Sequence, residues 1–429
     1  MSEQLTQELI DFIDNSPSMF HTIKTCREKL DAEGFVFLDP KAHWEIKEGG
    51  KYYTMTNASA IAAFCVNSLN IVEEGFKIVG THSDTPGFRI KPNPQIQFEN
   101  YIKLNTEIYG GPILNTWLDR PLSIAGRIAF KGQDPLHPSS TLVNINRPLL
   151  VIPNLAIHMN KEINNGVPIN KQKDILPILA YLDEIVDKNF LQELISKEIN
   201  VPAEDILDMD LFLHPFEKSM CVGLNNEFIS APRLDDLSMT YSALYGIINN
   251  TSKRGISLFA CFDNEEVGSR TRQGADSPFL ANILERILIS LSKTREEFFI
   301  ALENSFMISA DVAHLIHPNY PEKSDITNKV LPGKGPAIKI NSCFSYTTDS
   351  DSYSTFAALC KTHAIPYQVF VNRSDEKGGS TIGPVLASHL TMRSIDIGTP
   401  ILSMHSVREL MTEKDFIYTC KALLEFFNL

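Results

Sequence analysis

The sequence predicts an α/β fold, in which a mixed, largely parallel sheet is flanked by helices and interrupted by a β-rich insertion. The chain has 429 residues, enough for two domains with separate cores. Its first part has helical periods followed by strand-like runs, and its last part alternates strand-like runs with helical periods, which is typical of a sheet covered on both faces. Its middle holds short β-like pieces between Pro and Gly turns. We therefore expect a discontinuous domain from 1–92 and 229–429, and an inserted domain from 93–228.

The individual elements follow from the same patterns. Helical spacing predicts helices over Gln4–Asp14 and about Phe20–Glu33, followed by strands that end at Gly80. The middle contains the β-like pieces "YIKLNTEIYG", "LSIAGRIAF" and "SSTLVNI", and a charged stretch predicts a helix over about Ile175–Lys197. In the last part, the strand-like runs "GISLFACF", "SFMISA", "PYQVFV" and "PILSMH" alternate with helices predicted near Phe279–Leu291, Ser354–His363 and Lys414–Phe427.

Composition excludes several classes of function. The chain has 52 acidic and 39 basic side chains, a formal charge of -13, and no basic cluster that would neutralise phosphates. We therefore expect neither nucleic acid nor a membrane as a partner. The first residues are acidic and helically spaced, unlike a signal peptide, which favours a cytoplasmic location. Seven scattered cysteines without a C-x-x-C pair argue against a disulfide framework and a thiolate zinc site.

Histidines and carboxylates follow the predicted strands at the points where the strands end. Ligands of parallel α/β sheets bind beyond these carboxyl ends, so the residues found there are the candidates for a site. They are His82 and Asp84 after "FKIVG", Asp263 to Glu266 after "GISLFACF", Asp311 after "SFMISA" and His405 after "PILSM". A further carboxylate, Asp235 or Asp236, stands at the start of a predicted helix.

Each of these residues alone has an ordinary structural explanation. The aspartate at the helix start could be an N-cap, the two glutamates a solvated turn, and His405 a buried histidine with both ring nitrogens bonded. Together, in a chain without a thiolate alternative, they predict a pair of divalent metal ions held by His and carboxylate. In that arrangement, Asp84 is expected to accept the spare ring N–H of His82 and fix its tautomer.

Seven motifs resemble those of the aspartyl aminopeptidase family, metallopeptidase family eighteen, and occur in that family's order. They are "THSDTPGFRIKPNP", "APRLDDL", "DNEEVGS", "SADVAHLIHPNY", "GKGPAIKIN", "GGSTIGP" and "MHSVREL". The resemblance extends through "NTWLDRPLSIAGRI" and "IPNLAIHMN" in the middle. It implies that His82 and Asp311 bind one metal, that Glu266 and His405 bind the other, and that Asp235 bridges them. It also implies that Glu265 is the general base and that Asp84 stands behind His82.

The resemblance implies a zinc aminopeptidase that uses a metal-bridged water to remove N-terminal residues from short peptides. Cobalt or manganese would also suit such a site. The inserted domain would form dimers that assemble into a tetrahedral dodecamer, with His158 reaching the neighbouring subunit's site. Tyr346 is our candidate hydrogen-bond donor to the oxyanion that forms during hydrolysis.

The sequence departs from the family pattern at two places. Asp236 stands where many relatives have Asn, and the pair Glu376-Lys377 stands where relatives vary. We expect both departures to alter the rim of the site.

Preference for N-terminal Asp or Glu would require a cation in the substrate pocket. The family resemblance places a substrate-facing lysine at the position of Lys339, and His314 could assist it in binding the acidic side chain. The alternative is that Lys339 faces solvent on an edge strand. Relatives also include enzymes that prefer neutral or apolar N-terminal residues.

Two other functions compete with an aminopeptidase. A dinuclear deacylase or carboxypeptidase could share the ligand set. A protein from a different class, an inactive assembly or cargo protein on the same fold, would have lost the base or a ligand.

Overall fold

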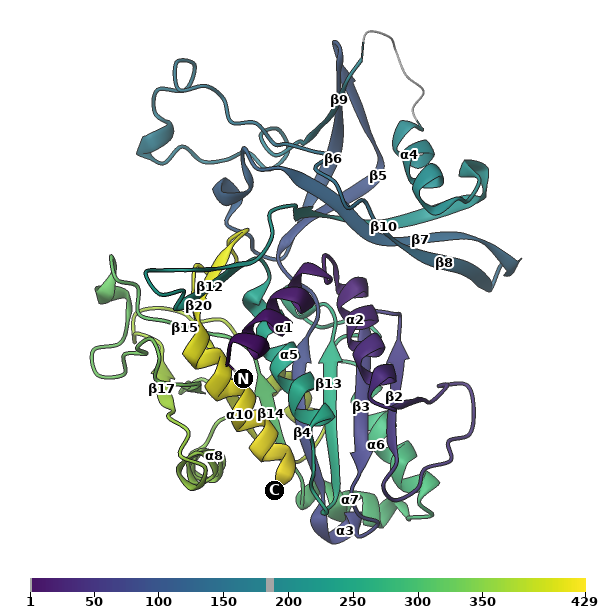
Figure 1. Ribbon diagram of the computed structural model, residues 1–429, viewed down its shortest axis with the longest axis vertical. Coiled ribbons are helices and arrows are strands. Elements are labelled where there is room, and N and C mark those ends of the chain that lie inside the picture. The colour runs from purple at the N-terminus through teal and green to yellow at the C-terminus, as the bar shows by residue number, and fades with distance from the viewer. Residues whose placement is uncertain (1, 183–188) are drawn as a thin grey trace.

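The chain folds around a nine-stranded sheet, shown in the lower half of the computed structural model in Figure 1, which describes residues 2–182 and 189–429. In spatial order its strands are β1 (Val36–Phe37), β2 (Lys51–Thr56), β3 (Ala60–Val66), β13 (Ile256–Phe262), β4 (Phe76–His82), β14 (Phe306–Ala310), β18 (Arg393–Gly398), β16 (Ala337–Ile340) and β17 (Gln368–Val371). The four strands β13, β4, β14 and β18 are mutually parallel. The predicted mixed, largely parallel sheet is confirmed.

Helices cover both faces of this sheet, as the alternation of elements predicted. One face packs against α1 (Ser2–Asp14), α2 (Met19–Ala32), α5 (Leu234–Ile248), α8 (Ser350–Thr362) and α10 (Glu413–Asn428). The other packs against α3 (Ile71–Glu74), α6 (Phe279–Ser290), α7 (Arg295–Glu303) and α9 (Ile382–Ala387). Along β3, Ile61 joins the first core and Ala62 the second, because successive side chains of a strand point to opposite faces. A strand buried on both faces is apolar throughout, as "AIAAFCV" is.

A six-stranded antiparallel sheet forms the upper half of Figure 1. Its order is β8 (His137–Asn144), β7 (Leu122–Asp134), β10 (Ile206–Pro215), β5 (Gly87–Phe98), β6 (Tyr101–Tyr109) and β9 (Ile178–Tyr181). These strands run from Gly87 to Pro215, so β5 begins before residue 93, where we placed the start of the insertion. The domain boundaries stay a prediction.

The predicted helix over Ile175–Lys197 is wrong in part. Ile178–Tyr181 forms β9, which pairs with β6, and helix α4 spans Phe190–Ile199. Residues 183–188 lie outside the described residues. The local charge pattern predicts the wrong secondary structure for "ILAY" because its pairing partner β6 lies far away in the sequence. Pairing with such a strand overrides local propensity.

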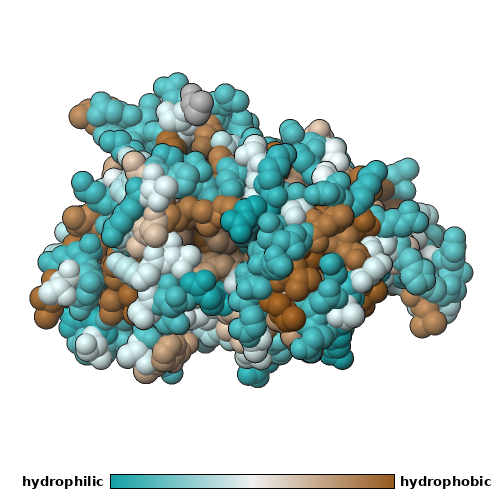
Figure 2. Space-filling model, turned by 90° about the horizontal axis from the view of Figure 1, so that it is seen from below, coloured by the Kyte–Doolittle hydropathy of each residue, from teal (hydrophilic) through white to brown (hydrophobic). Residues whose placement is uncertain are grey.

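A third sheet has five strands, in the order β11 (Met220–Val222), β12 (Phe228–Ala231), β20 (Glu409–Thr412), β19 (Pro400–Leu402) and β15 (Ala313–His314). It places the start of β20 beside the end of β12, where Ala231 pairs with Glu409. Among the described residues, no helix is long and apolar enough to cross a membrane. On the face that Figure 2 shows, apolar residues occur in separate patches between hydrophilic ones.

Candidate metal centre and active site

The predicted histidines and carboxylates meet at one edge of the nine-stranded sheet. His82 ends β4 beside Phe262, the last residue of the parallel strand β13. Asp311 directly follows β14, the neighbour of β4 on its other side. Glu265 begins the short 3₁₀ turn η4 (Glu265–Val267) after β13. Parallel strands thus bring together residues that are far apart in sequence, as expected from their position at the carboxyl ends.

Asp235 lies between two imidazoles. Its Oδ1 is 3.4 Å from Nε2 of His82, and its Oδ2 is 3.4 Å from Nε2 of His405. The His405 Nε2 also lies 3.6 Å from Oε2 of Glu266. The side chain of Asp235 is almost fully buried. One carboxylate oxygen therefore faces each histidine, which is the arrangement that a bridging carboxylate requires.

Hydrogen bonds fix the tautomers of both histidines. The Nδ1 of His82 is 3.0 Å from the backbone oxygen of Asp84, and the Nδ1 of His405 is 3.1 Å from the backbone oxygen of Gly111. A carbonyl oxygen can only accept, so each Nδ1 carries the proton and donates it. Each Nε2 faces Asp235, and it is the nitrogen that carries the free lone pair when the imidazole is neutral. Neutral imidazole with a free nitrogen is the form that binds metals.

Asp84 is placed behind His82 as predicted, but its carboxylate has different partners from those expected. Its Oδ1 lies 3.5 Å from Nδ1 of His82, and the ring proton goes to the backbone oxygen of the same residue at 3.0 Å. The expected acceptor is therefore corrected from side chain to backbone. The carboxylate instead accepts the backbone N–H of Glu265 at 3.0 Å, that of Glu266 at 3.1 Å, and the hydroxyl of Tyr109 at 2.8 Å.

Three overlapping groups of side chains could each hold a metal ion, with ligand atoms within 4.8 Å of one another. They are His82 with Asp235, Asp236 and Asp311; His82 with Glu265 and Glu266; and Asp235 with Glu266 and His405. Burial, opposed by His82 and assisted by nearby carboxylates such as Asp311, raises the pKa of Glu265 to about 7. Buried carboxylates at this density repel one another unless a cation or a proton compensates their charge.

The buried oxygens supply an independent test of metal binding. Among the described residues, Oδ1 of Asp235 and Oδ1 of Asp236 are buried and have no hydrogen-bond partner. A buried carboxylate oxygen without a partner is costly, and a divalent cation would satisfy it. The residues therefore fit a metal site in both donor chemistry and arrangement.

Asp236 differs from its expected place at the rim of the site. It is fully buried, and its Oδ2 accepts the backbone N–H of His82 at 3.0 Å. The expectation that this departure alters the rim is wrong. Its peptide bond with Asp235 is cis. Glu376 and Lys377 do line a surface cavity of about 360 Å³ together with His314, which lies three residues after Asp311.

Lys339 is buried inside the sheet. Its strand β16 pairs with β18 on one side and β17 on the other, and the residue is only 4% exposed. The alternative of a solvent-facing edge lysine is therefore wrong. Its Nζ lies 3.4 Å from Oδ2 of Asp311 and 5.4 Å from the ring centroid of Tyr346. Burial lowers the pKa of Lys339, but Asp311 and neighbouring acidic groups outweigh this effect and raise it overall.

Tyr346 and His158, two further predicted site residues, differ in their exposure to solvent. Tyr346 is buried beside Lys339. His158 lies in an exposed stretch of the middle segment, next to Ile157 and Met159, which are 52% and 70% exposed. The groups of potential metal ligands found among the described residues do not include His158. The exposed position of His158 fits both of its explanations: a residue that acts in the site of a second subunit, and a surface histidine without a catalytic role.

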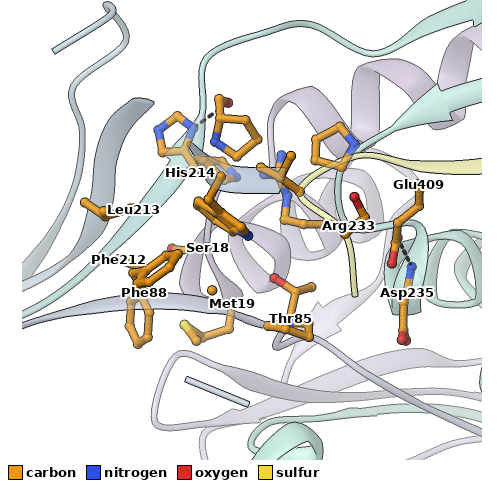
Figure 3. Close-up of a pocket in the computed structure, with 18 residues that line it drawn as sticks. Ser18, Met19, Thr85, Phe88, Phe212, Leu213, His214, Arg233, Asp235 and Glu409 are labelled. Carbon is orange, nitrogen blue, oxygen red and sulfur yellow. Dashed lines mark hydrogen bonds between the residues drawn. The ribbon is translucent and has the colours of Figure 1, made fainter. Parts of the chain in front are cut away.

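Glu409 is a structural residue of the site that the sequence did not reveal. Its Oε2 accepts the backbone N–H of Asp235 at 3.0 Å, a bond shown in Figure 3, and its Oε1 accepts that of His405 at 2.7 Å. It is 2% exposed, and burial raises its pKa to about 8. One carboxylate thus joins the backbone of Asp235 to that of His405. The only local signal is its place in "MHSVREL", four residues after His405.

Known proteins resemble this chain over nearly its whole length. The family model described as "Aminopeptidase I zinc metalloprotease (M18)" matches residues 12–427. A probable M18 family aminopeptidase 2 from Clostridium novyi is 53% identical over 428 residues, 99% of both chains. A namesake from Clostridium acetobutylicum is 50% identical over 428 residues, also 99% of both.

Solved structures match over the whole fold. The structure described as "Cryo-EM structure of the Ape4 and Nbr1 complex" superposes with a TM-score of 0.95 at 35% identity, covering 100% of this chain and 86% of the other. An M18 aminopeptidase from Thermotoga maritima superposes with a TM-score of 0.88 over 100% and 97%, and its 24% identity supports the fold alone. With the family model spanning nearly the whole chain and relatives at 50% identity or more, the protein belongs to the M18 family of zinc aminopeptidases.

Proposed function

We propose that the cluster holds two divalent ions, zinc foremost, with Asp235 shared between them. His82 and Asp311 would complete one site, and Glu266 and His405 the other. The observation that carries the proposal is the position of Asp235, whose two oxygens each lie 3.4 Å from a different histidine Nε2. When bound, the ions would supply Lewis acidity that activates a water and polarises the scissile carbonyl.

Glu265 is the proposed general base. It takes a proton from the attacking water and passes it to the leaving amine. Asp84 fixes its backbone at 3.0 Å, and the groups of candidate ligands include it beside His82. Tyr346, buried next to Lys339, is proposed to donate its hydroxyl proton in a hydrogen bond to the oxyanion of the tetrahedral intermediate.

We propose that the substrates are short peptides. Lys339 and His314 are our candidates for binding the side chain of an N-terminal Asp or Glu. Support comes from burial, because Lys339 is a buried ammonium next to the proposed ligand Asp311. The same contact favours a second candidate, an enzyme for neutral or apolar N-terminal residues. At 3.4 Å from Asp311, the lysine charge already has a partner within its own chain.

We also propose a homo-oligomer, with dimers that form a dodecamer. One solved relative is described as "Structure of S. cerevesiae mApe1 dodecamer" and is 28% identical, covering 99% of this chain and 96% of the other with a TM-score of 0.84. Exposed apolar side chains flank His158, including Leu155 at 53% and Ile157 at 52%. Burying them against a second copy would stabilise an interface and bring His158 toward that copy's site.

A reducing compartment such as the cytoplasm remains our proposal for the location. It is supported by the seven cysteines, which are all free thiols, among them the exposed Cys343. Oxidising compartments convert such thiols to disulfides.

The test is a panel of peptides that differ only in the first residue: Asp, Glu, Leu, Met and Ala. The metal-free protein is reconstituted with zinc, cobalt or manganese, and release of the first residue is followed by chromatography. We expect release from free peptides and none from the same peptides acetylated at the N-terminus. Release of acetate from the N-acetylated peptides would favour a deacylase and contradict the assignment. The ratio of kcat/KM for Asp over Leu decides between the two substrate classes.

A further inference from the structure

The end of strand β6, from the six-stranded sheet, reaches the candidate ligands of the same chain. The hydroxyl of Tyr109 donates to Oδ2 of Asp84 at 2.8 Å and accepts from Nδ2 of Asn264 at 2.8 Å. Asn264 directly precedes Glu265 in the turn after β13. Tyr109 therefore connects the two segments that carry His82 and the proposed base.

Asp84 transmits this contact to the backbone of two residues of the site. It is fully buried, and it accepts the N–H groups of Glu265 and Glu266 with its two oxygens, at 3.0 and 3.1 Å. A carboxylate that holds two consecutive N–H groups fixes the direction in which their side chains leave the chain. Without the Tyr109 hydroxyl, the carboxylate keeps these two backbone donors but loses its third, so it is held less firmly.

The two residues after Tyr109 touch the other side of the cluster. The backbone oxygen of Gly111 accepts from Nδ1 of His405 at 3.1 Å. Gly110 has a φ of 66°, and a Cβ there would lie 3.1 Å from Cβ of Glu266 and 3.3 Å from its Oε2. Glycine is required both for the left-handed backbone and for the close approach to Glu266.

We propose that Tyr109 is a positioning residue for the metal centre, and that Tyr109 to Gly111 hold the ligand Glu266, the ligand His405 and the base Glu265 in place. This inference rests on the proposed ligand set. It gives the six-stranded sheet a role in the active site of its own subunit, separate from any role in assembly. Tyr109 acts through Asp84 rather than by touching substrate or metal. Partners of this kind typically change metal affinity or activity by about 10–100-fold.

The first test is Tyr109→Phe, which removes only the hydroxyl. Zinc affinity is measured by competition with a chromophoric chelator, and the cobalt-loaded protein is examined by its visible absorption spectrum. We expect zinc affinity to fall by about 10–100-fold, an altered cobalt spectrum, and a lower kcat with little change in KM. The matched control is Tyr241→Phe, since the Tyr241 hydroxyl also donates to a carboxylate, Oε2 of Glu8 at 2.6 Å, away from the site.

The second test is Gly110→Ala, compared with Gly34→Ala. Gly34 has a φ of 78°, and a Cβ added there would meet nothing within 4 Å, so this variant carries the backbone strain without a contact to Glu266. We expect Gly110→Ala to lower zinc affinity and Gly34→Ala to leave it unchanged. Wild-type zinc affinity and cobalt spectrum in Tyr109→Phe, or an equal loss in Tyr241→Phe, would overturn the inference. A wild-type protein that binds no metal would instead overturn the proposed function.

Discussion

The edge of the nine-stranded sheet that carries the candidate metal ligands and the exposed stretch around His158 are built in opposite ways. At the sheet edge, charged groups are buried and hydrogen-bonded; Glu409, for example, accepts the backbone N–H groups of Asp235 and His405. Around His158, apolar side chains such as Met159 face outward. A buried ionic cluster is stable only if its charges are paired and hydrogen-bonded. An exposed apolar stretch points instead to a partner outside the chain. The comparison predicts that the chemistry resides in one subunit and that His158 contributes across a subunit contact.

The largest effect is expected at the proposed base. Glu265→Gln keeps the shape of the side chain and removes its ability to accept a proton, so kcat should fall by about 10²–10⁴-fold with normal metal content. Glu266→Gln is the matched control one residue away, and it should lose metal. Kinetics and elemental analysis of both variants check this. Should Glu265→Gln lose a metal while Glu266→Gln retains it, the two roles are reversed.

A mixing experiment tests whether the exposed stretch acts across subunits. His158→Ala should lower activity less than Glu265→Gln does, because it leaves both the candidate ligands and the proposed base intact. Mixed oligomers of the two variants should regain part of the activity, since some sites then combine an intact His158 with an intact Glu265. Subunit exchange is verified with differently tagged chains. No rescue in exchanged oligomers would confine His158 to a surface or interface role.

A smaller and selective effect is expected at the buried lysine. If Lys339 binds an acidic substrate side chain, Lys339→Met should lower kcat/KM for Asp and Glu substrates about 10-fold more than for Leu, the loss of a charge-assisted hydrogen bond worth ~1.5–3 kcal/mol. Lys77→Met is a suitable control, because Lys77 is buried and bonded to Ser252 at 2.8 Å, away from the cluster. An equal loss on all substrates would leave Lys339 as a partner of Asp311 alone.

The smallest effect is on stability. Removal of the ions by a chelator leaves the carboxylates around Asp235 uncompensated, so the native state should unfold more easily. A ligand present at 100 times its Kd stabilises the native state by about 2.7 kcal/mol, and the melting temperature should fall by a few °C. Differential scanning calorimetry with and without zinc measures this. An unchanged melting temperature would contradict a metal site in the folded core.

The sequence predicts those parts of the molecule whose signals are local. Strand ends rich in His and carboxylate place His82 and Asp311 at one edge because parallel strands align their carboxyl ends. Contacts between distant segments leave no such signal. Glu409 looks like any glutamate near a strand, and Tyr109 like any strand tyrosine, until the fold brings them to the site. The short strand β9 is mistaken for helix for the same reason, since its partner β6 is remote in sequence.

The central claim is that one chain supplies a complete site for two ions that share Asp235. The most direct measurement is the number of zinc ions bound per subunit, determined by elemental analysis of the reconstituted wild-type protein and of Asp235→Ala. The account predicts two ions per subunit in the wild type, and loss of both in the variant because the shared ligand is gone. A single ion per subunit in the wild type, or an Asp235→Ala variant that still binds both, would contradict it.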